Sequence, residues 1–199
     1  MRTPQIEIIA HTSIRKGMAK MVIRKAELKD IAGIAKVHVD SWRTTYKGIV
    51  PDTFLNSLSY ESREQIWKRG IEENHIYIAE DENGQIVGFA TGGKERTGKY
   101  EAYKGELYAI YLFEEQQGNG LGKKLIKSVV DDLLDKKLNS MLIWALEENP
   151  ACGFYEKLGG KKVDTAEIEI DGQKLGEIAF GWNDLSGIFV KDGLNEKNS

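Results

Sequence analysis

Three glycines, Gly118, Gly120 and Gly122, lie within five positions between an apolar run and a segment with helical spacing. Glycine destabilises regular structure by about 0.5–1 kcal/mol relative to alanine, so we expect a structural or binding requirement for glycine at these positions. The first N–H groups of a helix lack partners, and the helix dipole adds positive charge there. Bare backbone at such a junction would let an anion approach closely. The segment therefore has the chemistry of a phosphate cradle, with an ordinary glycine-rich turn as the alternative.

Two common phosphate-binding patterns do not fit this segment. A dinucleotide fingerprint needs G-x-G-x-x-G, but Lys123 stands where the third glycine belongs. A Walker-type loop needs four residues between its glycines and a Ser or Thr after the lysine, and Lys124 occupies that place. What is left is the pattern Gln117-x-x-Gly120-x-Gly122, whose main-chain donors suit a pyrophosphate.

Composition limits the class of protein. The 199 residues include 28 Lys and Arg against 31 Asp and Glu, which leaves no broad positive field for nucleic acid. The longest apolar run, at 108–113, is far shorter than the roughly 20 residues that span a bilayer, so we expect a soluble, cytoplasmic protein that does not bind membranes. One cysteine and three scattered histidines offer no metal-ligand spacing, so we expect no metal site.

Hydrophobic periodicity predicts one domain at 21–186, preceded by an extension at 1–20 and followed by a polar tail at 187–199. We expect an α/β (α+β) fold with a mixed, mostly antiparallel sheet of about seven strands and helices on both faces. Helices are predicted in 28–42, once or twice in 48–74, at 121–137 and in 150–158; strands are predicted in 21–26, twice in 75–93, at 105–113, at 140–146 and twice in 161–182.

With the pattern Gln117-x-x-Gly120-x-Gly122 after a central strand, the sequence resembles the GNAT superfamily of acetyl-CoA-dependent N-acetyltransferases, whose acyl-CoA loop reads Q/R-x-x-G-x-G/A. The resemblance runs from about Val22 to Trp182 and implies the GNAT fold. It also implies that the strand containing Ile110 splays from its parallel neighbour and that its main chain holds the pantetheine arm. Residues that the resemblance assigns to acetyl-CoA are Tyr111, Leu112, Phe113, Gln117, Gly118, Asn119, Gly120, Leu121, Gly122, Lys123, Asn149 and Tyr155.

Two candidate catalytic residues follow from the same resemblance. Glu106 lies 11 positions before Gln117, the offset of the general base in the histone-acetyltransferase branch. A base is needed because an ammonium must lose a proton before its nitrogen can attack a thioester, although a strand-end Glu is also commonly just solvated. The segment "ENPACGFYEKLGG" is similar to the superfamily motif N-x-x-(x)-A-x-x-F-Y-E-K-L-G-F.

In that motif Tyr155 is expected to protonate the departing thiolate, and Asn149 to hydrogen-bond the pantetheine or a bridging water. An aromatic core residue is the alternative for Tyr155. The sequence departs from the motif because only Pro150 separates Asn149 from Ala151 and because the segment ends in two glycines. Cys152 lies inside the segment and is expected to be a small buried hydrophobe.

The acceptor side is expected in the early helices and the late hairpin. The run W-R-x-x-Y-x-G-I-x-P, which begins at Trp42, resembles one found in a group of bacterial GNAT proteins. Trp42 and Tyr46 lie four positions apart, on one helical face. They, together with Glu106, are the candidate substrate-binding residues, and core packing is the alternative for Trp42.

The sequence therefore predicts transfer of an acetyl group from acetyl-CoA to a primary amine of a small molecule or peptide, by direct attack in a ternary complex. One alternative is a noncatalytic acyl-CoA-binding regulatory module. Another is an acyltransferase that uses a different acyl-CoA or an O-acceptor. A homodimer is expected only by analogy with the superfamily.

Overall fold

The computed structural model describes residues 21–73 and 75–189. The extension predicted at 1–20 and most of the tail predicted at 187–199 lie outside these described residues. No helix in the described ranges is long and apolar enough to cross a lipid bilayer.

Seven strands in the described chain form one sheet in the order β1-β2-β3-β4-β5-β7-β6. Neighbouring strands are antiparallel except β4 and β5, which run parallel. The predicted mixed, mostly antiparallel sheet is thus confirmed. The strands are β1 (Val22–Lys25), β2 (His75–Glu80), β3 (Ile86–Lys94), β4 (Gly105–Leu112), β5 (Met141–Leu146), β6 (Lys161–Ile170) and β7 (Gln173–Trp182).

The α-helices of the described chain are α1 (Ile31–Thr45), α2 (Asp52–Ser57), α3 (Tyr60–Glu73), α4 (Leu121–Asp135) and α5 (Cys152–Lys157). Both α2 and α3 lie where one or two helices were predicted. The first helix begins later than expected, because Leu28 lies in a 3-10 turn and is 58% exposed. Its apolar side chain therefore does not belong to the buried face of α1.

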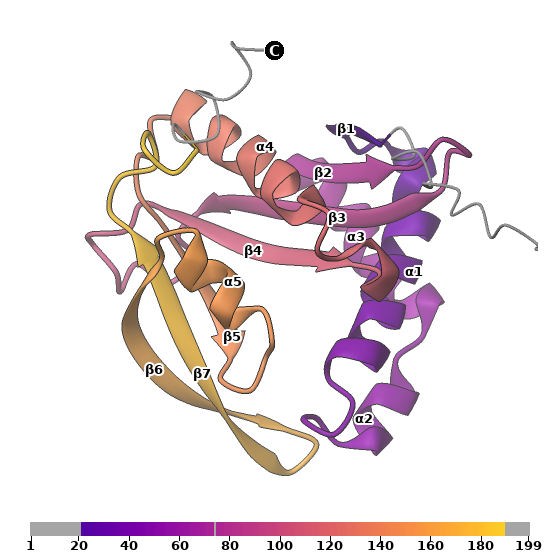
Figure 1. The fold of residues 1–199 in the computed structure, drawn as a ribbon. Coiled ribbons are helices and arrows are strands. Elements are labelled where there is room, and N and C mark those ends of the chain that lie inside the picture. The colour runs from indigo at the N-terminus through magenta and orange to yellow at the C-terminus, as the bar shows by residue number, and fades with distance from the viewer. Residues whose placement is uncertain (1–20, 74, 190–199) are drawn as a thin grey trace, which may run out of the picture.

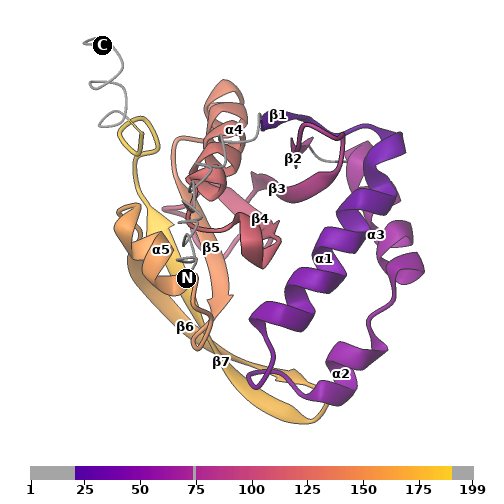
Figure 2. The same cartoon turned by 45° about the vertical axis from the view of Figure 1, so that its right-hand side comes forward.

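The helices cover both faces of the sheet (Figures 1 and 2). Helices α1 and α3 lie over one face of β2 to β4, and α4 lies over the other. The apolar positions of α4 repeat every three or four residues, and Leu125, Val129 and Leu133 are almost fully buried against the strands. Helix α5 packs on β5 and β7, where the Trp182 indole N–H donates to the Leu158 carbonyl at 3.0 Å. The main core therefore spans both faces of the sheet.

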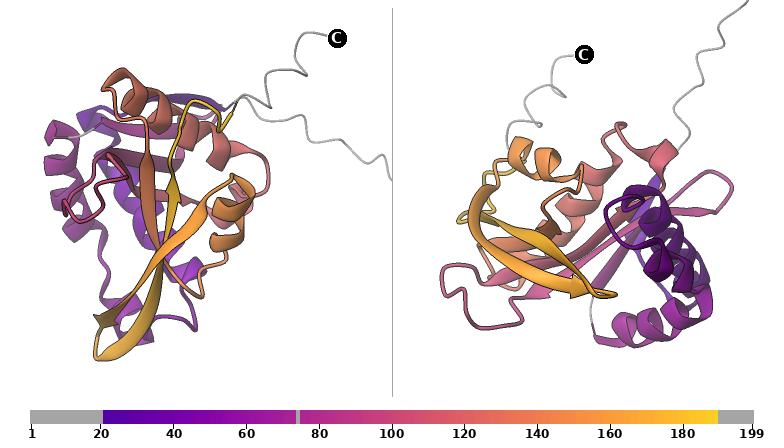
Figure 3. Two further views of the ribbon diagram at one scale, coloured as in Figure 1. Left: turned by 90° about the vertical axis from the view of Figure 1, so that its left-hand side faces the viewer. Right: turned by 90° about the horizontal axis from the view of Figure 1, so that it is seen from below.

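The β6–β7 hairpin extends past the end of β5 toward α2 (Figure 3). Its turn has positive φ at Asp171 (50°) and Gly172 (81°), which matches the right-handed twist of a tight hairpin. The Gln173 side chain donates to the Ile49 carbonyl at 3.3 Å, just before α2. The hairpin thus ties the last part of the chain to the early helices.

An irregularity in β4 opens the centre of the sheet. Thr91 pairs with Ala109 and Gly92 with Leu107, so Tyr108 is an extra residue, a β-bulge, in β4. On the other edge, β4 pairs with β5 only at Gly105 and Glu106. Beyond that point the two parallel strands part, as the resemblance implied, and the β4 edge that faces β5 has no strand partner.

The close approach of α4 to this bulge predicts a strict requirement for glycine at position 92. A Cβ atom there would lie 2.6 Å from Cγ1 of Val129 and 2.7 Å from the Glu106 carbonyl oxygen. We expect Gly92→Ala to lower the free energy of unfolding by about 1–3 kcal/mol, because the backbone oxygen cannot easily move away. Gly153→Ala, with no atom within 4 Å of the added Cβ, is the matched control and should be neutral or slightly stabilising. Equal denaturant midpoints for the two variants would contradict this packing.

Candidate functional site

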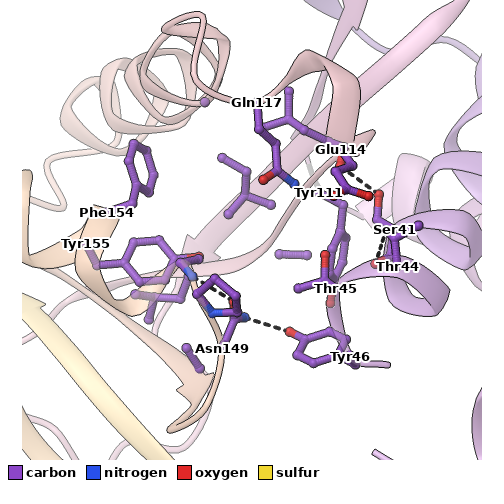
Figure 4. A pocket seen from close by; sticks show the side chains of 18 of the residues that line it. Ser41, Thr44, Thr45, Tyr46, Tyr111, Glu114, Gln117, Asn149, Phe154 and Tyr155 are labelled. Atoms are coloured by element: carbon purple, nitrogen blue, oxygen red, sulfur yellow. Dashed lines mark hydrogen bonds between the residues drawn. The ribbon is translucent and has the colours of Figure 1, made fainter. Parts of the chain in front are cut away.

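A cavity of about 790 Å³ lies where β4 and β5 part (Figure 4). Its walls come from the end of α1, the open edges of β4 and β5, the glycine segment before α4, and the start of α5. Its volume falls within the range usual for ligand and cofactor sites. Apart from β5, the chain segments that meet here each contain at least one candidate site residue.

The glycine segment forms one end of the cavity. Gly118 (φ 76°) and Gly120 (φ 77°) both have left-handed backbone, which residues with a Cβ rarely adopt. Gly120 is the N-cap of α4, and no described group accepts a hydrogen bond from the N–H groups of residues 118–122. Gln117 extends into the cavity beside them (Figure 4), and Gly122 and Lys123 complete this wall. This end therefore presents unpaired donors at a helix N-terminus and suits an anion.

The middle of the cavity is a slot between the two parted strands. Its β4 wall includes Ile110, Tyr111 and Leu112, and its β5 wall includes Ile143 and Ala145. The Leu112 carbonyl already accepts from the Ser41 hydroxyl at 3.0 Å. The remaining main-chain groups on the open β4 edge can pair with an extended, amide-bearing ligand as an added strand would.

Two buried tyrosines and an asparagine form the other end. Tyr155 is 3% exposed and packs on Phe180 with ring centroids 5.7 Å apart. The Tyr155 hydroxyl has no hydrogen-bond partner among the described residues. Across the cavity, the Tyr46 hydroxyl accepts from the Asn149 amide at 2.9 Å (Figure 4). The cavity thus has phenol groups at the end away from the glycines.

These phenols stay protonated at ordinary pH. Burial raises the pKa of Tyr155 above its usual range, and the nearby Tyr111 raises it further. Burial likewise raises the pKa of Tyr46, with additional contributions from Tyr111 and Tyr155. Each phenol can therefore donate a hydrogen bond, or a proton to a strongly basic group, but neither can serve as a base near neutral pH.

Glu106, the predicted general base, is buried and paired with Arg96. It is 3% exposed and does not line the cavity. Its Oε2 accepts from the Nε of Arg96 at 3.1 Å and from the backbone N–H of Arg96 at 3.2 Å, and its Oε1 pairs with the Arg96 guanidinium. This geometry corrects the expectation of a base in contact with substrate, because both carboxylate oxygens already have cationic or N–H partners.

Trp42 also lies outside the cavity walls. Its ring packs on Tyr46 (4.6 Å between centroids) and on Phe54 (5.7 Å), so the core alternative describes it better than an acceptor contact. Next to it, His38 accepts from the Trp67 indole at 3.0 Å. Burial, with the neighbouring Arg63, lowers the pKa of His38 to about 3, so this imidazole is neutral and structural.

Three other predicted site positions, and Cys152, do not contribute side chains to the cavity. Phe113 is buried, and its N–H donates to the Val87 carbonyl at 3.1 Å. Leu121 belongs to the core, and Asn119 is exposed outside the walls. Cys152 is half-buried with its thiol directed at the Leu146 carbonyl at 3.4 Å, and burial raises its pKa, which fits the expected small hydrophobe.

Sequence reasoning missed several residues of the walls, among them Ser41, Thr44, Thr45, Tyr108, Trp144 and Phe154. The sequence did contain a signal for the missed residues of β5. A strand that parts from its neighbour exposes both facing edges, so the strand predicted at 140–146 was a candidate as soon as the splay was expected. Within the residues that the structure describes, no group of three or more His, Cys, Asp or Glu side chains could hold a metal ion.

Comparison with known proteins gives a consistent picture. Residues 39–160 match the model of the Acetyltransferase (GNAT) family. The uncharacterized N-acetyltransferase YuaI of Bacillus subtilis is 44% identical over 168 residues, which cover 84% of this chain and 96% of that protein. An L-methionine sulfoximine/L-methionine sulfone acetyltransferase of Pseudomonas aeruginosa is 27% identical and covers 82% of this chain and 90% of its own length.

A similar solved structure is that of yncA, a putative acetyltransferase from Salmonella typhimurium with its cofactor acetyl-CoA. It has a TM-score of 0.64 and 22% sequence identity, and the match covers 84% of this chain and 95% of that chain. At this identity the likeness concerns the fold.

The raised pKa values of the two cavity phenols can be measured directly. In protein labelled with ¹³C at tyrosine Cζ, and with resonances assigned through Tyr46→Phe and Tyr155→Phe, we expect neither phenol to ionise below about pH 10, the ordinary tyrosine pKa. Burial disfavours the phenolate, so the protonated form persists to higher pH. Ionisation of either residue at or below its ordinary value would contradict the described environment.

Proposed function

Since the chain belongs to the acetyltransferase (GNAT) family and is an acetyl-CoA-dependent N-acetyltransferase, we propose that its central cavity binds acetyl-CoA and passes the acetyl group directly to a primary amine. The supporting observation is the parting of β4 and β5, with unpaired N–H donors at one end of the gap and protonated phenols at the other. A noncatalytic module is not favoured, because the family and the relatives are acetyltransferases.

The chain's residues fit the three parts of this cosubstrate, which supplies an acetyl group activated as a thioester. The N–H groups of residues 118–122 and the side chain of Gln117 would hold the diphosphate. The open edge of β4 at Ile110 to Leu112 would pair with the pantetheine amides. Tyr155 would lie at the sulfur, where a buried, protonated phenol is available as a hydrogen-bond donor.

In the proposed transfer, the amine nitrogen forms a C–N bond with the acyl carbon, and the C–S bond breaks with its electron pair on sulfur. Tyr155 donates a hydrogen bond to that sulfur, which stabilises the departing thiolate, and the thiolate takes its proton from solvent. The acceptor ammonium loses one proton to water before the attack, and its nitrogen loses a second proton to water once the C–N bond has formed, because the Glu106 carboxylate is occupied by Arg96. Glu106 would then act by holding Arg96 in place.

The acceptor is proposed to be a small amine that carries a carboxylate. One relative is named for L-methionine sulfoximine and L-methionine sulfone, which are amino-acid derivatives. The Arg96 guanidinium, whose side chain is 60% exposed, lies 4.5 Å over the ring of Tyr108, a residue of the cavity wall. A cation at this margin would favour an anionic substituent on the acceptor. The cytoplasmic location and the homodimer expected from the sequence stay predictions.

The direct test of the function is thiol release from acetyl-CoA across a panel of primary amines. We expect release with amino acids and their side-chain analogues, and weaker release with polyamines and with amino-acid amides, because these lack the carboxylate. Preference for acceptors without a carboxylate would overturn the acceptor class. Acetyl-CoA binding without turnover on every amine would overturn the activity.

Gly120 should be essential for cosubstrate affinity. An added Cβ would meet no protein atom within 4 Å, so it would project into open space at the anion-binding end of the cavity. We expect Gly120→Ala to weaken acetyl-CoA binding by about tenfold or more in calorimetry. Gly172→Ala is the matched control, since it places alanine at a similar φ (81°) in the distant β6–β7 turn. Equal affinities in the two variants would count against the proposed diphosphate site.

A further inference from the structure

We propose that Asn149 positions the Tyr46 hydroxyl so that it donates a hydrogen bond to the acyl oxygen of bound acetyl-CoA. The inference rests on the proposed function, because it needs the acyl group to lie at the tyrosine end of the cavity. The family resemblance implies a different partner for Asn149, the pantetheine arm, and places Tyr46 only near the acceptor. The hydrogen bonds of the two side chains lead to a more specific role.

The direction of the Asn149 amide is fixed by its neighbours. The backbone N–H of Ala151 can only donate, and it lies 2.9 Å from the side-chain oxygen of Asn149. The side-chain nitrogen therefore faces Tyr46, where it donates to the phenol oxygen at 2.9 Å. Asn149 is 9% exposed and Tyr46 is 7% exposed, so water has little access to compete for these bonds.

Because the orientation of the Asn149 amide is fixed, the Tyr46 hydroxyl is left as a hydrogen-bond donor. Its oxygen accepts from Asn149, so its own hydrogen is the group that remains to be donated. Among the described residues, no acceptor for that hydrogen is found, and Tyr46 lines the cavity. The raised pKa of the buried phenol keeps this hydrogen in place near neutral pH. The Tyr46 hydroxyl is therefore a polarised hydrogen-bond donor at the cavity surface, and a bound ligand must supply its acceptor.

The acyl oxygen is the acceptor that matches this donor. The attacking nitrogen carries hydrogens of its own and needs acceptors, so a fixed donor does not suit it. Tyr155 is the proposed hydrogen-bond partner of the sulfur. It lies close enough to Tyr46 to raise the pKa of Tyr46. Oxygen and sulfur are both bonded to the acyl carbon, so two neighbouring phenols, one just after α1 and one on α5, can each donate a hydrogen bond to one of these atoms. A donor preset toward the oxygen would also stabilise the negative charge that develops there during transfer.

The first test compares the binding of acetyl-CoA with that of CoA, which lacks the acyl oxygen. By calorimetry we expect Tyr46→Phe to weaken acetyl-CoA binding by about threefold to tenfold, the range for one net hydrogen bond, and to leave CoA binding unchanged. Tyr100→Phe removes a hydroxyl that pairs with Asp164 on β6 and does not line the cavity, so it is the control. If Tyr46→Phe affects both ligands equally, or neither, the inference is wrong.

The second test reverses the hydrogen bond without removing it. In Asn149→Asp, the carboxylate still accepts from the N–H of Ala151 but cannot donate to Tyr46, so the Tyr46 hydrogen turns toward it and away from the cavity. We expect Asn149→Asp to reduce the preference for acetyl-CoA over CoA as much as Tyr46→Phe does, and the double variant to show no further loss. Additive losses, or an unchanged preference in Asn149→Asp, would mean that Asn149 serves only to join α1 to the start of α5.

Turnover separates the inference from the proposed function. With an amine that the wild type acetylates, Tyr46→Phe and Asn149→Asp should each lower kcat by about 10- to 100-fold with little change in the KM of the amine. An unchanged kcat in both variants would contradict the role during transfer. If the wild type acetylates no amine, the proposed function fails, while the binding comparison still decides whether Tyr46 contacts the acyl oxygen. Unfolding midpoints and CoA affinity show whether each variant is folded.

Discussion

The early end of pairing between β4 and β5 is the constraint on which the rest of this molecule depends. Two parallel strands normally pair along their length and leave no room for a ligand, but here pairing stops after Glu106. The bulge at Tyr108 lets β4 stay paired with β3 while it turns away from β5, and β7 pairs along the whole of β5. The gap is therefore held open from both sides by intact sheet.

The chemistry of the two ends of this gap follows from which elements reach them. A helix begins at one end, so unpaired N–H groups and a partial positive charge are available without any charged side chain. The other end is closed by Tyr46, just after α1, and by Tyr155 of α5, which are both buried and stay protonated. One end is thus suited to an anion, and the other end presents hydrogen-bond donors.

Much of this arrangement could be predicted from the sequence, because local signals carry it. The glycine pattern placed Gln117 to Gly122 at a strand-to-helix junction, and the motif around Tyr155 placed a phenol after the next strand. The partners of buried polar groups could not be predicted, since Arg96 reaches Glu106 across a loop and Asn149 reaches Tyr46 from 103 positions away. For the same reason Trp42, which has helical spacing to Tyr46, could not be assigned to core or cavity until the packing of Phe54 was known.

A crystal structure with bound acetyl-CoA would decide whether the gap between β4 and β5 is the cosubstrate site. We expect the diphosphate against the N–H groups of residues 118–122, the pantetheine arm paired with the open edge of β4, and β4 and β5 as far apart as they are without ligand. Acetyl-CoA bound elsewhere on the molecule, or backbone pairing of β4 with β5 beyond Glu106, would contradict this role of the gap.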